Sequence, residues 1–237
     1  MPILRTTVVT VPVIITSIVN RPDLLDRMID SVDVPVGRFL VVDNGNVGYQ
    51  RPGVTVWSPP FGSLGWPGTQ NFGIMQTADA PWWLIVNNDA YFPPGKLAEL
   101  CERMSQPEPV VHHHEFTMFA LNRAVVELIG LVDEYSFWPL YFDDTDYAYR
   151  CHLAGIPLHY GDWIVEGDDD HPVSLTINSD PELALANNRT WQLNQTAYMA
   201  KWGGLPGDER FVTPWDSGMP LWVTRPSVEG RDARRWP

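Results

Sequence analysis

Residues 82–94 read WWLIVNNDAYFPP, an apolar run that turns polar within one step of the chain. Apolar runs of this length, bounded by turn residues, are typical of buried strands in an α/β sheet. Ligands of such sheets gather outside the carboxyl ends of the strands. Asn87, Asn88 and Asp89 follow the run directly. The pattern therefore predicts either a polar turn or the mouth of a binding site.

Strand-like and helix-like segments alternate along the rest of the chain, which predicts an α/β fold with a mostly parallel sheet. Strands are expected at 13–18, 39–43, 54–57, 82–86, 156–160 and 162–167, and helices at 21–32, 63–78, 93–106, 144–155 and 180–204. Residues 110–130 are expected to form one strand that runs into a helix. We expect residues 1–175 to form the core of this fold, and residues 176–237 a helix and loop extension packed on it.

The balance of charge excludes some classes of partner. Sixteen basic and 29 acidic residues give a net charge of −13, which argues against broad binding to nucleic acid or to anionic membranes. No apolar stretch reaches the ~20 residues of a membrane span. Cys101 and Cys151 show no pairing pattern, so a reducing, cytoplasmic compartment is expected.

Acidic side chains recur at positions where a ligand would bind. Asp43 ends the apolar run FLVV as Asp89 ends WWLIV, and FDDTD at 142–146 places three carboxylates within four residues. A helix N-cap explains one of these carboxylates, and an i,i+4 pair between Asp146 and Arg150 explains another. Their mutual repulsion favours a cation or a bound partner nearby.

The order of these motifs resembles that of inverting, nucleotide-sugar-dependent glycosyltransferases with the GT-A fold, in the large family-two group and especially its rhamnosyltransferase-like members. The resemblance rests on VVDNG at 41–45, LGWPGTQNFGI at 64–74, LIVNNDAYFPPGKL at 84–97, IGLVDEYSFWPLYFDDTDYAYRCHLAG at 129–155 and the tail YMAKWGG…ERFVTP at 198–214. It covers residues 13 to about 215. Each motif alone is unspecific, whereas the five in this order are specific.

The resemblance implies a divalent metal, Mn²⁺ or Mg²⁺, that neutralises the departing diphosphate. Asp89 matches the metal ligand, and Asn87 stands at the first position of the motif, where the family often has Asp. His171 matches a histidine that can complete the metal shell. The structural alternative for His171 is an ordinary loop residue.

The resemblance also implies a general base, because an alcohol acceptor must lose its proton as it attacks. It places that base at Asp144, with Asp143 in contact with the acceptor. Trp66 and Trp138 lie inside the motifs and are the tryptophans expected to stack on an acceptor sugar. The structural alternative for Asp144 is an N-cap, a role compatible with catalysis.

The resemblance implies a UDP-sugar or a dTDP-sugar as the donor. Asp43 would accept a ring N–H of the base, or would only cap the turn that follows it. The expected donor contacts are Thr16, Asn20, Arg21, Asp43, Gly65, Asn71, Asn87 and Asn88.

Other functions remain open from the sequence. A sugar nucleotidyltransferase would need a glycine-rich triphosphate loop near the N-terminus, and VIITSIVNRPD at 13–23 lacks glycine. A non-catalytic sugar-nucleotide-binding module is the other alternative. The acceptor hydroxyl would belong to a glycan, a protein side chain or a hydroxylated DNA base, as in stand-alone bacterial or phage enzymes. His112, His113 and His114 alternate faces of a strand and so do not predict a zinc triad.

Overall fold

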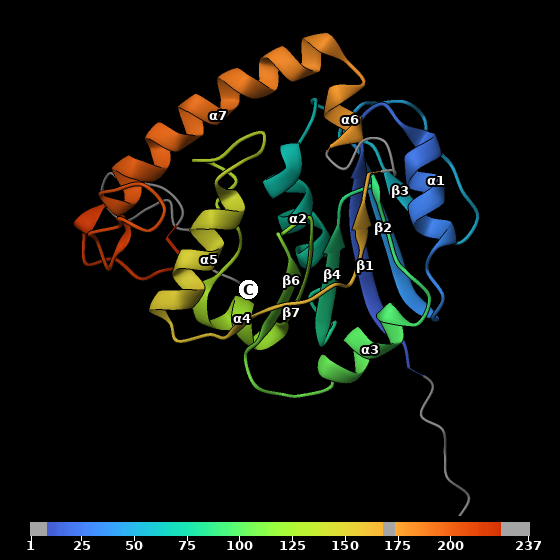
Figure 1. Ribbon diagram of the computed structural model, residues 1–237, viewed down its shortest axis with the longest axis horizontal. Helices are drawn as coiled ribbons and strands as arrows, with labels where there is room; N and C mark the ends of the chain where they lie inside the picture. Colours follow the sequence, from blue (N-terminus) through green and yellow to red (C-terminus); the bar gives the residue numbers. More distant parts are fainter. Residues whose placement is uncertain (1–8, 168–173, 224–237) are drawn as a thin grey trace, which may run out of the picture.

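A seven-stranded sheet lies between two layers of helices in the computed structural model, which describes residues 9–167 and 174–223 (Figure 1). The strand order is β3-β2-β1-β4-β7-β6-β8. These strands are β1 (Val11–Ile18), β2 (Val36–Asp43), β3 (Thr55–Trp57), β4 (Trp82–Val86), β6 (Val111–His114), β7 (Met118–Asn122) and β8 (Leu158–Tyr160). The two edge strands, β3 and β8, have three residues each.

The strand directions confirm the predicted mostly parallel sheet. Among the described strands of this sheet, only β7 is reversed: it pairs antiparallel with both β4 and β6, while the other four pairings are parallel. The carboxyl ends of β1, β2 and β4 therefore meet at one edge of the sheet.

Both faces of the central strands are buried, which explains their continuous apolar runs. Along β1, Ile14 and Ile18 point into one core and Val13 and Ile15 into the other. The first core is covered by α1 (Pro22–Asp30) and α3 (Lys96–Arg103). The second is covered by α2 (Gly65–Gln76), α4 (Arg123–Ile129) and α5 (Asp143–Leu153).

The segment 110–130 differs from the expected single strand. It forms the antiparallel pair β6 and β7 before α4 begins. The chain reverses at Glu115 and Phe116, which both have left-handed φ angles of 45° and 57°. Neither residue is a usual turn former, so composition did not mark this turn. A second, two-stranded sheet pairs β5 (Ala90–Tyr91) with β9 (Val165–Glu166).

The C-terminal helix α7 (Pro181–Trp202) follows the short α6 (Leu175–Asn178) and crosses above the sheet to lie over α5 (Figure 1). The Asp180 carboxylate caps its N-terminus by accepting hydrogen bonds from the backbone N–H groups of Glu182 and Leu183. No helix in the described part of the chain has the length and apolar character needed to cross a bilayer.

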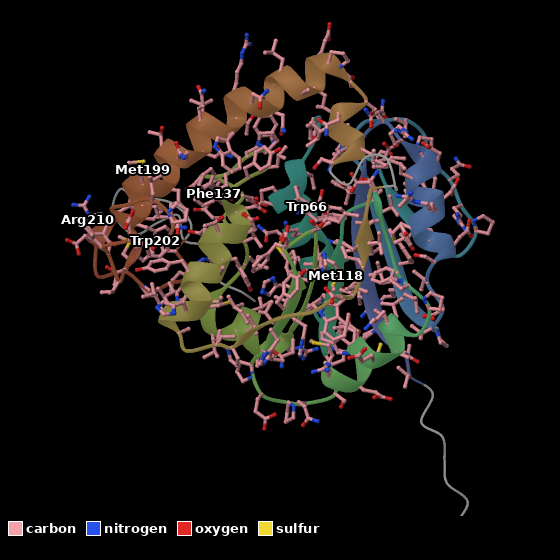
Figure 2. All side chains as sticks on the ribbon, in the orientation of Figure 1. Trp66, Met118, Phe137, Met199, Trp202 and Arg210 are labelled. Atoms are coloured by element: carbon pink, nitrogen blue, oxygen red, sulfur yellow. The ribbon has the colours of Figure 1, made fainter. Side chains whose placement is uncertain are left out.

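Buried charges join the end of α7 to the core. Lys201 is fully buried, and its Nζ lies 2.8 Å from Asp133 Oδ2 and 2.6 Å from Asp146 Oδ1. Arg150 Nε donates to Asp146 Oδ2 at 2.9 Å, which confirms the pair expected from their i,i+4 spacing. Burial acts to raise the pKa of Asp146, but the Lys201 and Arg150 charges outweigh it and hold that pKa below its usual range. Trp202, the last residue of α7 and labelled in Figure 2, donates its indole N–H to Asp146 Oδ1 at 2.8 Å.

Lys201→Met should destabilise the protein by about 3–5 kcal/mol, because the change leaves Asp133 and Asp146 buried with one cation between them. Urea unfolding followed by circular dichroism measures this difference. Lys96→Met is the control, since Lys96 forms an exposed pair with Glu99 that should contribute less than about 1 kcal/mol. Equal losses in the two variants would show that burial of the Lys201 network does not matter.

Candidate active site

Polar side chains with unsatisfied atoms lie where β1 and β4 end. Thr16 Oγ1, Asn20 Oδ1 and Asn88 Nδ2 are buried and have no hydrogen-bond partner among the described residues. Buried polar atoms in native proteins are rarely left unpaired, and exceptions often mark a ligand or ordered water. These three atoms belong to residues expected to contact the donor. A molecule with both hydrogen-bond donors and acceptors would satisfy them.

Asp43 holds the loop after β2. Its two carboxylate oxygens accept hydrogen bonds from the backbone N–H groups of Val47 and Gly48, both at 2.9 Å. Next to it, Asn44 Oδ1 accepts from the Leu64 N–H and Asn44 Nδ2 donates to Thr69 Oγ1, so the end of β2 is tied to α2. This geometry matches the turn-capping alternative, and a contact between Asp43 and a nucleobase stays a prediction.

Asp89 is buried at the end of β4, beneath α6. Its Oδ2 accepts a hydrogen bond from the Thr176 N–H at 3.4 Å, while Asn88 Oδ1 accepts from Thr176 Oγ1 at 3.1 Å. The adjacent residue Ala90 pairs with Glu166 in the small sheet. Glu166 Oε1 is buried without a partner among the described residues. Burial raises the pKa of Glu166, and the charge of Asp89 raises it further.

Asp89 and Glu166 together offer the oxygen ligands that Mg²⁺ and Mn²⁺ accept. Glu166 was missed by the sequence reasoning; its only signal was the short segment VEG upstream of His171. His171 itself lies outside the described residues. Within residues 9–167 and 174–223, no three His, Cys, Asp or Glu side chains form a group that could hold a metal ion.

Asp143 and Asp144 open α5, and their environments differ. Asp143 is only 2% exposed, and its Oδ2 accepts a hydrogen bond from Gln70 Nε2 of α2. Asp144 is partly exposed, and its Oδ1 accepts from the backbone N–H of Thr145. Burial raises the pKa of both carboxyls, and the neighbouring Asp144 charge raises that of Asp143 further. Asp144 is therefore the one of the pair that solvent reaches.

The two predicted acceptor tryptophans lie on segments that touch. The backbone N–H of Trp66 donates to the Pro139 carbonyl at 2.7 Å. Gly65 has a φ of 70°, and a Cβ there would lie 2.7 Å from the same carbonyl and 3.0 Å from Trp138 Cδ1. Only glycine fits this close approach. Trp138 is 55% exposed, whereas Trp66 packs partly into the core.

Three predicted donor contacts have protein partners. The Asn71 side chain donates to the Val132 carbonyl at 2.9 Å and accepts from its N–H at 3.0 Å. The Arg21 guanidinium pairs with the Asp23 carboxylate through two hydrogen bonds. The backbone N–H of Asn87 donates to the Thr117 carbonyl at 2.9 Å. A donor contact at Arg21, Asn71 or Asn87 stays a prediction.

The loop before α5 is strained and is held by α7. Tyr141 and Phe142 have φ angles of 73° and 65°, a conformation that costs a non-glycine residue about 1–3 kcal/mol. Asn194 Nδ2 donates to the carbonyls of Leu140 at 2.8 Å and Tyr141 at 3.2 Å. The Trp191 ring lies 5.0 Å from that of Phe142. Such strain persists only where surrounding contacts impose it, so α7 sets the entry into α5.

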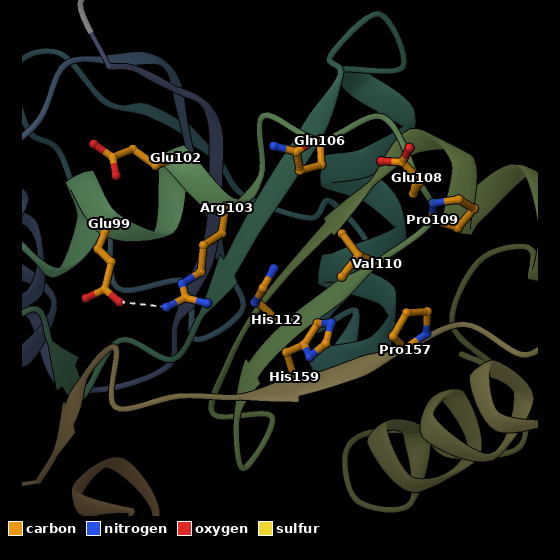
Figure 3. A pocket seen from close by; sticks show the side chains of 10 residues that line it. All are labelled: Glu99, Glu102, Arg103, Gln106, Glu108, Pro109, Val110, His112, Pro157 and His159. Atoms are coloured by element: carbon orange, nitrogen blue, oxygen red, sulfur yellow. Dashed lines mark hydrogen bonds and ion pairs between the residues drawn. The ribbon is translucent and has the colours of Figure 1, made fainter.

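Two cavities of about 550 and 530 Å³ lie away from these residues. The larger one is lined by residues of α3, the start of β6 and β8, including Arg103, His112 and His159 (Figure 3). Both cavities border the amino ends of β4 or β6, whereas ligands of α/β sheets gather at the carboxyl ends. Neither cavity is therefore the candidate active site.

No protein-family model and no curated protein matches the sequence. Among solved structures, the mannosyltransferase PcManGT from Pyrobaculum calidifontis, in complex with GDP-Man and Mn²⁺, has a TM-score of 0.51 and 15% identity over 84% of this chain and 76% of that chain. S. aureus TarS 1-349 in complex with UDP has a TM-score of 0.52 and 10% identity over 80% of this chain.

The likeness extends over only part of TarS. This chain covers 65% of the UDP-bound TarS chain, and in a second TarS structure it covers 60% with a TM-score of 0.49. At these identities the similarity shows the fold, and it confirms the predicted GT-A-type architecture.

Asp143→Asn should stabilise the protein at neutral pH by about 1 kcal/mol or more, since each unit of pKa shift corresponds to about 1.4 kcal/mol. In the unfolded chain this carboxyl ionises at its ordinary pKa, whereas the folded protein holds the proton to higher pH. Wild-type stability therefore falls as pH rises between those two values, and asparagine removes that loss.

Thermal unfolding measured from about pH 3 to about pH 8, in steps of about one pH unit, tests this effect. The difference between Asp143→Asn and the wild type should shrink as pH falls toward the ordinary aspartate pKa. Asp208→Asn, at an exposed position, serves as the control. A pH-independent difference would contradict the burial argument for Asp143.

Proposed function

We propose that this protein is a glycosyltransferase that moves a sugar from a nucleotide-diphosphate sugar to a hydroxyl acceptor, with inversion at the anomeric carbon. The observation that carries the proposal is the meeting of Asn20, Asn88 and Asp89 around Thr176, beside the carboxyl end of β1. Thr16 Oγ1, Asn20 Oδ1 and Asn88 Nδ2 are buried there without a hydrogen-bond partner among the described residues. A nucleotide-sugar offers hydroxyls and a diphosphate to such a site. The fold shared with a mannosyltransferase bound to GDP-Man and Mn²⁺ supports this choice.

The site also fits a divalent cation. Asp89 lies next to Ala90, which pairs with Glu166, and Glu166 Oε1 has no hydrogen-bond partner among the described residues. Asp89 and Glu166 would hold Mn²⁺ or Mg²⁺, with His171 as a further ligand. When bound, the ion would neutralise charge on the leaving diphosphate. Asn88 Oδ1 accepts a hydrogen bond from Thr176 Oγ1, which holds α6 next to Asp89.

The proposed base is Asp144. The acceptor oxygen attacks the anomeric carbon, its proton passes to the Asp144 carboxylate, and the bond from that carbon to the diphosphate oxygen breaks. A raised pKa makes Asp144 a stronger base than an ordinary aspartate. Asp143 is as buried as the residues of the donor half, so its proposed contact with the acceptor stays a prediction. We propose that Asp143, beside Asp144 at the start of α5, meets the acceptor together with the exposed Trp138.

The preferred donors are UDP-sugars and dTDP-sugars. A glycan or a protein side chain fits the net charge of −13 better than DNA does, so a hydroxylated DNA base is the less favoured acceptor. We propose a bacterial or phage enzyme of the cytoplasm, a reducing compartment that suits the free thiols of Cys101 and Cys151. A thermal-shift screen of UDP-, GDP- and dTDP-sugars with Mn²⁺ tests the donor class, and no shift with any donor would contradict the proposal.

Asp89→Ala should abolish the metal dependence of nucleotide binding, because Asp89 supplies a charged oxygen to the cation. In the wild type, calorimetry should show tight binding of a nucleoside diphosphate with Mn²⁺ and weak binding with chelator. Asp79→Ala, which removes the carboxylate of the exposed ion pair with Arg38, is the control and should keep the metal dependence. Equal wild-type affinity in Mn²⁺ and in chelator would rule out the metal.

Asp144→Asn should keep donor binding and slow transfer by ~10² or more, since an amide cannot take the acceptor proton. The wild-type rate should rise with pH through a value above the ordinary aspartate range, because only the ionised carboxylate acts as a base. Release of the nucleoside diphosphate reports both. Near wild-type transfer by Asp144→Asn would assign the base to another residue.

A further inference from the structure

We infer that Asn194 of α7 is a positioning residue that holds the loop in front of Asp144 in its reactive conformation. The inference rests on the proposed function, because it assigns a structural support to the proposed base. Helix α7 carries no residue expected to contact substrate, and its part in the active site is to hold this loop.

The contacts between α7 and the loop come from one side of the helix. Asn187, Trp191 and Asn194 follow each other at intervals of four and three residues, so they lie on the same helix face. Asn187 Nδ2 donates to the Tyr141 hydroxyl, and the Trp191 ring lies 5.1 Å from the Tyr141 ring. All three side chains therefore meet the same stretch of loop.

Asn194 makes the most specific of these contacts. It is only 4% exposed, and its Nδ2 lies within 3.5 Å of the carbonyls of Trp138, Leu140 and Tyr141. Three carbonyls from within four consecutive residues converge on one amide because the loop curls around it. A side chain of the same size without a donor would leave these carbonyls unpaired in a buried place.

The loop conformation determines where α5 begins. Phe142 precedes α5 with a φ of 65°, and its carbonyl accepts the backbone N–H of Asp146 at 2.9 Å. Asp144 lies within this first helical turn. If the left-handed residues Tyr141 and Phe142 relax to ordinary angles, the first turn of α5 must rotate, and the Asp144 carboxylate moves with it.

The other end of α7 is fixed independently of Asn194. Lys201 forms buried ion pairs with Asp133 and Asp146, two helical turns beyond Asn194. Loss of the Asn194 amide should therefore leave α7 docked and release the loop alone. Thr16, Asn20 and Asn88 lie on other elements, so donor binding should survive.

The test compares Asn194→Leu with Asn188→Leu, an identical change at an exposed position of the same helix. The assay is hydrolysis of UDP-glucose, GDP-mannose or dTDP-rhamnose with Mn²⁺, in which water replaces the acceptor. Asn194→Leu should lower kcat at least tenfold while the donor KM changes less than twofold. Asn188→Leu should match the wild type. A normal kcat in Asn194→Leu, or equal loss in both variants, would overturn the inference.

Hydrogen–deuterium exchange separates this inference from the proposed function. Backbone amides of residues 140–146 should exchange at least tenfold faster in Asn194→Leu, and those of β1 and β4 should not change. Unchanged exchange at 140–146 would overturn the positioning role even if the enzyme transfers sugar. If the wild type hydrolyses no donor while the exchange result holds, the proposed function fails and the loop support stands.

If Asn194→Leu does not fold, Trp191→Leu replaces it. Trp191 is 47% exposed, so its loss should be tolerated, yet its ring contacts both Tyr141 and Phe142. The same selective fall in kcat and rise in exchange is expected. A folded Trp191→Leu protein with wild-type kcat and exchange would overturn the inference by this second route.

Discussion

Two carboxylates and two cations, all buried, hold α7 on the body of the protein. Asp146 receives Arg150 from its own helix and Lys201 from α7, and Lys201 also meets Asp133. The two positive and two negative charges cancel, so this group carries no net charge. Hydrophobic residues of similar size often stabilise a fold as well as a buried ion pair does. The buried ion pairs differ from apolar contacts because their hydrogen bonds are directional. They therefore fix the position at which α7 packs on the core.

From that anchor the candidate site divides into two halves with different supports. The donor half consists of side chains at the ends of neighbouring strands, where the sheet itself sets their spacing. The half containing Asp143 and Asp144 lies at the start of a helix and not at a strand end. It depends on a strained loop that is hydrogen-bonded to α2 through Trp66 and to α7 through Asn194. Gly65 lets α2 approach the Pro139 carbonyl of the loop closely, and Asn194 of α7 donates to the Leu140 carbonyl. Contacts distant in sequence thus place the proposed base.

The sequence reveals what local physics determines. Apolar runs with both faces buried identified β1 and β4, and the i,i+4 spacing of Asp146 and Arg150 predicted their pair. The hairpin of β6 and β7 was not predicted, because its turn uses Glu115 and Phe116 in place of the usual turn residues. Within the site, Glu166, Gln70 and Asn194 could not be predicted from local pattern. Each matters through a partner far along the chain, and such contacts leave no periodic trace in the sequence.

The short edge strands of the sheet affect how the protein behaves in concentrated solution. An edge strand presents unpaired N–H and C=O groups on which another chain can add a strand, and long flat edges promote such aggregation. Here β3 and β8 each present only three residues, and the Tyr160 side chain projects from β8 into solvent. The sheet therefore offers a foreign strand too short a template for stable pairing. Repulsion between molecules of net charge −13 also acts against such edge pairing.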